Sequence, residues 1–251
     1  MSTAISWTDE TLNVWEGCTK VAPGCDNCYA EARDQRFHGG IHWGAGAERR
    51  LVGGATLKTK LRDARRTGLR ESRRPRVFVG SLMDWADKEA PQGGARERLW
   101  ELVRTAPDVD WMMLTKRAPN IRRHLPADWG DGYPNVWLGV TVEDRRHGLP
   151  RADILRSIPA AVRFLSCEPL LEDLGTLDLT GIGWVIAGNE SGPNARHCEL
   201  GRIRSLRDQC LAADVAFHFK QWCVEGKPIH APMLDGRQWL EFPVPSGQEA
   251  A

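Results

Sequence analysis

Three of the seven cysteines in this 251-residue chain, Cys18, Cys25 and Cys28, lie within eleven positions in a C-x6-C-x2-C arrangement. A C-x2-C pair is the tightest spacing that lets two thiolates bind one metal centre. Glycines before Cys18 and Cys25 let backbone N–H groups approach the sulfurs. Structural zinc sites use four protein ligands, whereas an open site keeps one position for another molecule. Three thiolates on a four-iron cluster would leave one iron open, so the spacing favours an open iron–sulfur site.

Two other interpretations of the cysteines remain open. They could bind zinc together with a distant histidine, because His38 and His42 are within reach along the chain. They could also be unrelated buried thiols, since free cysteine is commonly buried. Elsewhere, Cys167 is a possible hydrogen-atom donor or an ordinary buried thiol, and we expect Cys198, Cys210 and Cys223 to be structural.

The composition is that of a soluble globular protein, with 41% hydrophobic and 27% charged residues. A chain of this length can bury a substantial core, and no linker separates a second domain, so we predict one domain over residues 1–251. The formal net charge of +1 gives no overall sign of nucleic-acid binding. Arginines concentrated in residues 62–76 could contact phosphates or form a solvated helix face.

No segment resembles a signal peptide or a membrane span. The odd number of cysteines, clustered at one end, argues against a secreted disulfide scaffold. We therefore expect a cytoplasmic protein with reduced thiols.

Short apolar segments alternate with amphipathic ones from residue 76 onward. The strand-like segments are residues 76–80, 111–115, 135–140, 162–166, 183–188 and 215–219; the helix-like ones are 95–104, 120–124, 149–158 and 200–213. Apolar strands separated by helices indicate a parallel sheet buried on both faces. With the stretch before Cys18 there are six to seven strands. We predict an α/β fold, a complete or partial TIM-like parallel (β/α) barrel with the cysteine loop after its first strand.

Polar residues follow the predicted strands at their ends. In a parallel barrel these ends converge on one rim, where such enzymes place their chemistry. The alternative is that the charged side chains pair with one another and simply close the rim. The candidate site residues are Ser81, Asp84, Lys116, Thr141, Glu143, Glu168, Glu190 and Lys220.

Two segments fall outside this alternating pattern. Residues 38–60 are rich in glycine and are predicted to form a surface excursion or lid. Residues 224–251 show little periodicity and are predicted to be a loosely packed C-terminal tail.

The stretch from Gly17-Cys18 to Gly24-Cys25-Asp-Asn-Cys28-Tyr29-Ala30 resembles the radical S-adenosylmethionine (SAM) superfamily. It is most similar to the branch around spore photoproduct lyase, in which the third cysteine is followed by tyrosine and a small residue. The superfamily's usual spacing is C-x3-C-x2-C, so this chain has a longer first interval.

A second resemblance covers nearly the whole chain. It is to a phage-associated family with the same three-cysteine motif, of poorly defined function, whose members often accompany a "three-Cys-motif partner" protein. The matching segments are Phe78-Val-Gly-Ser81-Leu-Met-Asp84, Leu114-Thr-Lys116-Arg117, Asn135-Val-Trp-Leu-Gly139-Val-Thr-Val-Glu143, Phe164-Leu-Ser-Cys167-Glu168-Pro169, Trp184-Val-Ile-Ala-Gly188-Asn-Glu190-Ser191 and Phe219-Lys220-Gln221-Trp222.

These resemblances imply a 4Fe–4S cluster bound by Cys18, Cys25 and Cys28, with SAM on the open iron. Electron transfer would cleave SAM to methionine and a 5′-deoxyadenosyl radical. The electron would come from a reductant protein such as a flavodoxin or ferredoxin. Ser81 and Asp84 are expected to hold the SAM amino group, and Thr141 and Glu143 its ribose hydroxyls. Lys116, Glu168, Glu190 and Lys220 are expected at the substrate or the SAM carboxylate.

Three functions are compatible with these features. The first is a radical SAM enzyme that modifies or repairs nucleic acid or a nucleoside. The second is a radical SAM enzyme acting on a small metabolite or peptide. The third is a non-catalytic binding protein braced by zinc or a cluster. The sequence favours the first.

Overall fold

The computed structural model describes residues 3, 5–192 and 194–244. The chain divides into two compact units, Met1–Trp137 and Leu138–Ala251. Both units combine helices with mostly parallel strands.

The first unit contains three parallel strands in the order β1 (Glu10–Leu12), β4 (Arg76–Val79) and β5 (Asp110–Thr115). Leu12 pairs with Val79, and Phe78 pairs with Met112. The apolar side chains of β4 and β5 are almost all buried, as expected for strands covered on both faces. Two short strands, β2 (Trp15–Glu16) and β3 (Arg50–Leu51), form a separate antiparallel pair.

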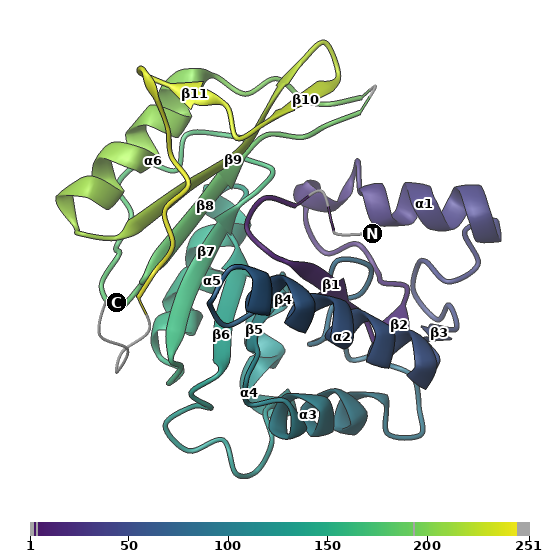
Figure 1. The fold of residues 1–251 in the computed structure, drawn as a ribbon. Helices are drawn as coiled ribbons and strands as arrows, with labels where there is room; N and C mark the ends of the chain where they lie inside the picture. The colour runs from purple at the N-terminus through teal and green to yellow at the C-terminus, as the bar shows by residue number, and fades with distance from the viewer. Residues whose placement is uncertain (1–2, 4, 193, 245–251) are drawn as a thin grey trace. The chain divides into compact units, whose positions relative to one another are not determined.

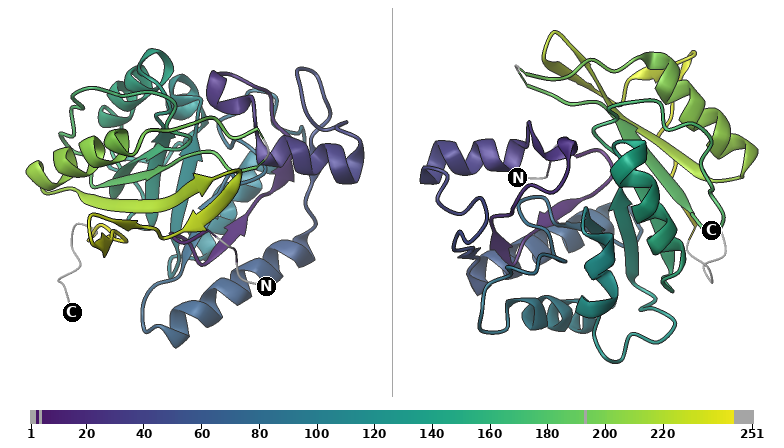
Figure 2. Two further views of the ribbon diagram at one scale, coloured as in Figure 1. Left: turned by 90° about the horizontal axis from the view of Figure 1, so that it is seen from above. Right: turned by 180° about the vertical axis from the view of Figure 1, so that it is seen from behind.

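The helices of the first unit are α1 (Tyr29–His38), α2 (Gly54–Arg70), α3 (Ala95–Thr105) and α4 (Ile121–His124), with 3-10 turns η1 (Pro23–Cys25) and η2 (Ala118–Asn120). Leu99, Trp100 and Val103 recur at helical spacing on α3 and are buried. Figures 1 and 2 show α2 as a long helix beside β1, and it contacts both β1 and β4.

The chain passes from the first unit to the second within β6 (Val136–Thr141). The strands of the second unit follow in the order β6, β7 (Val162–Cys167), β8 (Trp184–Gly188), β9 (Ala216–Val224) and β10 (Lys227–His230). Strands β7, β8 and β9 are parallel, and β10 returns antiparallel to β9 as the hairpin visible in Figure 1. The remaining elements are α5 (Arg145–Arg156), α6 (Leu200–Ala212), β11 (Met233–Leu234) and β12 (Arg237–Gln238).

The structure confirms a mixed α/β fold with mostly parallel strands. Each predicted strand-like and helix-like segment coincides with an observed strand or helix. Residues 38–60, predicted as an excursion, contain β3 and the start of α2. The predicted tail contains β10 to β12 and buries Leu234 and Trp239, while residues 245–251 lie outside the described part. No helix in the described part of the chain has the length and apolar character needed to cross a membrane.

Candidate functional site

The three clustered cysteines lie on the loop that joins β2 to α1. Cys18 lies two residues after the end of β2, Cys25 ends η1, and Cys28 is the residue that caps the start of α1. All three thiols are half-buried and none forms a disulfide. The loop is therefore held at both ends by regular structure, with its sulfurs neither fully exposed nor sealed in the core.

Cys28 lies at the N-terminal end of α1. Burial raises the pKa of its thiol, but the backbone N–H groups of Glu31 and Ala30 and the Lys116 ammonium lower it. Neighbouring Cys25 raises it, which places these two sulfurs within electrostatic reach of each other. Free N–H groups and the helix dipole favour negative charge at a helix start, so this position suits a thiolate.

Gly17 brings the backbone of the loop against the segment after α1. Its φ of +115° lies in the left-handed region, and a Cβ there would come within 2.3 Å of the His42 carbonyl oxygen. Its N–H donates to Leu82 O at 2.9 Å. His42 is itself held by Asp34, whose carboxylate lies 2.8 Å from Nδ1. A side chain at position 17 would displace Cys18 from this setting.

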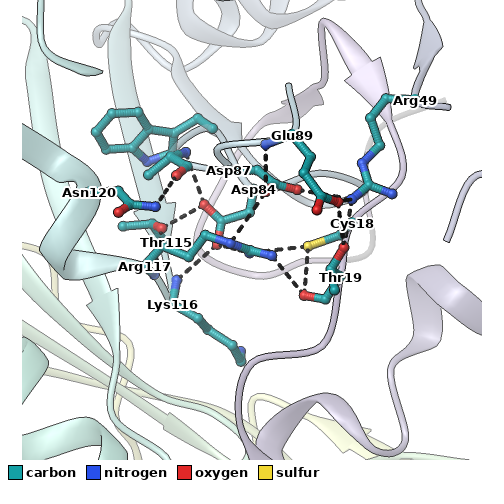
Figure 3. A network of polar contacts seen from close by, with 12 residues as sticks. Cys18, Thr19, Arg49, Asp84, Asp87, Glu89, Thr115, Lys116, Arg117 and Asn120 are labelled. Carbon is teal, nitrogen blue, oxygen red and sulfur yellow. Dashed lines mark hydrogen bonds and ion pairs between the residues drawn. The ribbon is translucent and has the colours of Figure 1, made fainter. Parts of the chain in front are cut away.

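Arg117 connects Cys18 to the segment that follows β4, as Figure 3 shows. Its Nη1 donates to Cys18 Sγ at 3.3 Å and to Asp84 Oδ2 at 2.8 Å, and its Nη2 donates to Thr19 O at 2.8 Å. Only 9% of Arg117 is exposed. A buried guanidinium therefore lies between a thiol, a carboxylate and the backbone of the cysteine loop.

The Asp84 carboxylate has four hydrogen-bond donors around it. Oδ1 accepts from Thr115 Oγ1 at 2.6 Å and from Ala86 N at 3.0 Å. Oδ2 accepts from Lys116 N at 3.2 Å and from Arg117. Both oxygens are thus engaged in holding the loops after β4 and β5 together, which is a positioning role.

Arg49 holds the same loop from the other direction. Its Nη2 donates to Thr19 Oγ1 at 2.7 Å and lies 2.9 Å from Glu89 and 3.3 Å from Asp87. Its Nη1 donates to the carbonyls of His42 and Gly44. We call this set, Cys18, Thr19, Arg49, Asp84, Asp87 and Arg117, the cysteine-loop region (Figure 3).

Charge and burial act in opposite directions on Cys18. Burial, reinforced by Asp84 and Asp87, raises its pKa to about 12, while Arg117 opposes the rise. Burial disfavours the Arg117 cation, but Asp84, Cys18 and Asp87 outweigh it and raise the pKa of Arg117. Without a metal ion, Cys18 is therefore a protonated thiol beside a permanent cation, and metal binding would release its proton.

The other predicted residues of the first unit border this region. The Ser81 hydroxyl accepts from Asn13 Nδ2 at 2.8 Å, and the Ser81 carbonyl accepts from Tyr29 OH at 2.7 Å. Lys116 gives only its backbone N–H to Asp84, and its side chain extends away from that carboxylate in Figure 3. Its positive charge lowers the pKa of the Cys28 thiol, against the larger opposing effect of burial.

In the second unit, Lys220 and Glu168 form an ion pair at 3.0 Å, with side chains 19% and 11% exposed. Ala187 pairs with Phe219 and Gly188 with Gln221, so Lys220 is the extra residue of a β-bulge in β9. Bulges re-aim side chains and are frequent beside active sites. A Cβ on Gly188 would lie 2.7 Å from Glu168 Oε1, so the glycine leaves room for this carboxylate.

Glu143 is completely buried after β6. Its Oε2 accepts from Arg151 Nη1 on α5, which also donates to the Thr141 carbonyl at 3.0 Å. Its Oε1 has no hydrogen-bond partner among the described residues. Buried polar atoms are normally paired, so this oxygen is a place where a bound hydroxyl or N–H group would be accommodated.

Asn189 and Glu190 follow β8. Gln221 Nε2 donates to the Asn189 carbonyl at 2.7 Å, and in the described chain the buried Asn189 Oδ1 has no partner. Glu190 accepts from both the N–H and the Nε of Arg196 at 2.9 Å. We call Glu143, Glu168, Asn189, Lys220 and Gln221 the strand-end region.

Cys167 ends β7 with no exposed surface. Burial, with Cys210, Glu168 and Glu143 nearby, raises its pKa well above the ordinary value. It is therefore a neutral buried thiol.

The cysteines suit an iron–sulfur cluster in their chemistry. They supply three thiols from one loop, with a guanidinium at Cys18 and two backbone N–H groups at Cys28, and such donors stabilise cluster sulfur. Among the described residues, no three His, Cys, Asp or Glu side chains are gathered into a group that could hold a metal ion. Support for a cluster therefore comes from the donor set and the shared loop rather than from a preformed group.

Sequence reasoning assigned no role to Arg49, Asp87, Arg117 or Arg151, which the structure places in buried ion pairs. Arg117 could have been noticed, because it directly follows the predicted strand end at Thr115 and Lys116. Arg49 lies in a glycine-rich segment with no periodic pattern, so nothing in the sequence marked it.

A family model matches residues 2–243, and its description is "Protein of unknown function (DUF5131)". Because the match covers nearly the whole chain, the protein belongs to this family. No curated protein and no solved structure matches the chain.

Proposed function

We propose that this member of the DUF5131 family is a radical SAM enzyme that binds a 4Fe–4S cluster through Cys18, Cys25 and Cys28. One observation carries the proposal: three half-buried thiols share a loop, with a guanidinium in contact with Cys18, and with Cys28 at the start of α1. When bound, the cluster and SAM would supply one-electron cleavage of SAM to a 5′-deoxyadenosyl radical.

The chain's own residues would position this chemistry. Arg117 and Arg49 hold the loop at Cys18 and Thr19, so the first thiol is fixed before any metal binds. We predicted that Asp84 binds the SAM amino group, but its oxygens already accept four hydrogen bonds. We therefore assign Asp84 to positioning and keep Ser81 as the candidate for the amino group.

The strand-end region would receive the ligands. Glu143 Oε1 is a buried acceptor suited to a ribose hydroxyl, with Thr141 beside it. Glu168, Glu190 and Lys220, with Lys116 near Cys28, are proposed at the substrate or the SAM carboxylate. These roles assume the predicted complete or partial TIM-like barrel, in which the C-terminal ends of the parallel strands lie at one rim.

The proposed substrate is nucleic acid or a nucleoside, on the strength of the resemblance to the spore photoproduct lyase branch. A small metabolite or peptide is the alternative substrate, and a non-catalytic zinc- or cluster-braced protein is the alternative class. The enzyme would need a one-electron donor such as a flavodoxin or ferredoxin, and a three-Cys-motif protein is a candidate partner. A reducing cytoplasm fits such a site.

The test is anaerobic reconstitution with iron and sulfide, followed by electron paramagnetic resonance of the reduced protein with and without SAM. We expect a four-iron signal that changes when SAM is added, together with formation of 5′-deoxyadenosine. Cys25→Ala should abolish the signal, whereas Cys223→Ala, a half-buried cysteine outside the loop, should retain it. Zinc bound in place of a cluster, or equal loss in both variants, would overturn the proposal.

A further inference from the structure

A basic cavity lies between α3 and the end of α4 in the first unit. Its volume is about 210 Å3, and it is lined by Arg96, Arg104, Arg123 and His124, with Glu97 and Trp100. The size suits a group as small as phosphate. Arg104 pairs with Glu101 at 3.2 Å and with Asp128 at 3.9 Å, so the positive charge of the lining comes from Arg96 and Arg123.

The arginines of this cavity differ from those concentrated in residues 62–76. Along α2 and after it, arginines pair with carboxylates, as in Arg65 with Asp108 at 2.7 Å and Arg73 with Asp9 at 2.6 Å. That stretch is therefore largely neutralised within the protein. The arginines of residues 62–76 therefore stabilise the fold through ion pairs, whereas Arg96 and Arg123 in the cavity are available to a ligand.

Arg123 and Arg96 have no carboxylate partner of this kind. Arg123 is exposed, and its side chain forms no hydrogen bond or ion pair with any described residue. Arg96 donates to backbone carbonyls, those of Trp85 at 3.0 Å and of Asp87, and so keeps its full charge. Burial lowers the pKa of Arg96, the carboxylates of Glu97, Asp87 and Asp84 oppose this, and Arg123 lowers it further. Arg96 and Arg123 repel each other, and an anion bound between them would offset this repulsion.

His124 adds a polar group to the same cavity. Its Nε2 is buried and has no hydrogen-bond partner in the described chain, and its backbone carbonyl accepts from Trp100 Nε1 at 2.9 Å. The anchored backbone holds the imidazole beside Arg96 and Arg123, both of which lower its pKa in addition to burial. A neutral imidazole can donate one hydrogen bond to an oxyanion.

We propose that this cavity binds a phosphate group, with Arg123 and Arg96 as its charge partners and His124 as a hydrogen-bond donor. Guanidinium groups form strong charge-assisted hydrogen bonds to phosphate. The phosphate could belong to a nucleic-acid backbone or to a small phosphorylated molecule.

The cavity also borders the segment that supports the cysteine loop. Arg96 holds the carbonyls of Trp85 and Asp87, and the side chains of Asp84 and Asp87 contact Arg117 and Arg49. If the proposed function is correct, on which this step alone rests, the phosphate of a nucleic-acid substrate would be held one chain segment away from Cys18.

The test uses the full-length protein without cluster or SAM, so its outcome is independent of the radical chemistry. Inorganic phosphate is titrated while the ring signals of His124 are followed by NMR and identified through their absence in His124→Gln. We expect a saturable shift, and roughly tenfold weaker binding in Arg123→Gln, the loss of about one charge-assisted hydrogen bond. Arg123→Lys keeps the charge and should retain most of the affinity.

The matched control is Arg66→Gln, because Arg66 is exposed on α2 and pairs with Asp63 at 3.6 Å. It should bind phosphate like the wild type. The thermal midpoints of all variants check that each is folded. Absence of a saturable shift at His124, or equal weakening in Arg66→Gln and Arg123→Gln, would overturn the proposal.

A second titration identifies the source of the phosphate. A nucleic-acid backbone is supported if a single-stranded oligonucleotide displaces phosphate from His124. In that case the slope of log affinity against log salt concentration should become shallower by about one in Arg123→Gln. Displacement by a nucleoside monophosphate but not by the oligonucleotide supports a small phosphorylated ligand. Failure of both to perturb His124 would contradict either source and the site with it.

Discussion

The cysteine-loop region and the strand-end region both bury charged side chains, but they satisfy them differently. In the cysteine-loop region, Asp84 accepts four hydrogen bonds, and Arg49 and Arg117 bind loop carbonyls as well as carboxylates. In the strand-end region, Glu143 and Asn189 each keep a buried oxygen without a partner among the described residues.

The difference indicates that the two regions have different structural roles. The cysteine-loop network fixes the backbone, because displacing Asp84 or Arg117 would break several bonds at low dielectric; in the described chain, Arg49 Nε is its one buried polar side-chain atom without a partner. A buried acceptor without a partner has a cost that a ligand's hydroxyl or N–H group would remove. Under the proposed function, the cysteine-loop region would position the first cluster ligand, Cys18, and the strand-end region would receive small molecules.

Asp84→Asn should cost the most stability, about 3–5 kcal/mol, because it leaves the buried Arg117 without its carboxylate and places an amide against N–H donors. The free energy of unfolding in urea measures the loss. The control is Asp63→Asn, whose carboxylate lies on exposed α2 near Arg62 and Arg66 and should contribute less than about 1 kcal/mol. Equal losses of stability in the two variants would show that the hydrogen bonds of Asp84 do not stabilise the cysteine-loop region.

Glu143→Gln should cost about 2 kcal/mol, since the amide oxygen can still accept from Arg151 and the second oxygen has no bond to lose. The same urea measurement gives the value. A loss as large as that of Asp84→Asn would contradict the idea that the strand-end region is incompletely satisfied.

Gly188→Ala should cost about 1–2 kcal/mol, because its Cβ would meet Glu168 Oε1 and push the carboxylate away from Lys220. The end of a side chain can move, so the fold should tolerate the change. Thermal unfolding gives the stability, and a crystal structure of the variant shows whether the ion pair is broken. An undisturbed pair would mean that Gly188 is not required for it.

Cys210→Ala should alter the alkaline stability of the protein by the smallest amount. Burial, with Glu241 nearby, raises the pKa of Cys210 to about 12. Because the folded pKa is raised, this thiol's contribution is fully present below the unfolded pKa of roughly 9 and is lost as pH rises toward 12. From about pH 9 to pH 10, the wild type should lose roughly 1 kcal/mol more than Cys210→Ala. Parallel curves would show that Cys210 ionises normally in the folded protein.

Much of the fold could be predicted from the sequence because strand and helix periodicities are local. The segments around Val77 to Val79, Met112, Val185 and Phe217 read as strands, since uninterrupted apolar residues suit a sheet buried on both faces. The tail was harder to predict, because Leu234 and Trp239 are buried by distant contacts that leave no periodic trace.

The candidate site could also be predicted only in part from the sequence. The cysteine spacing and the polar residues at strand ends could be read from the sequence, because these depend only on residue type and position along the chain. The folded structure was needed to show that Asp84 accepts four hydrogen bonds, that Arg117 contacts Cys18, and that Glu143 Oε1 has no partner among the described residues. Cys18 and Arg117 are 99 positions apart, and hydrogen bonds and charge pairs depend on distances that folding alone sets.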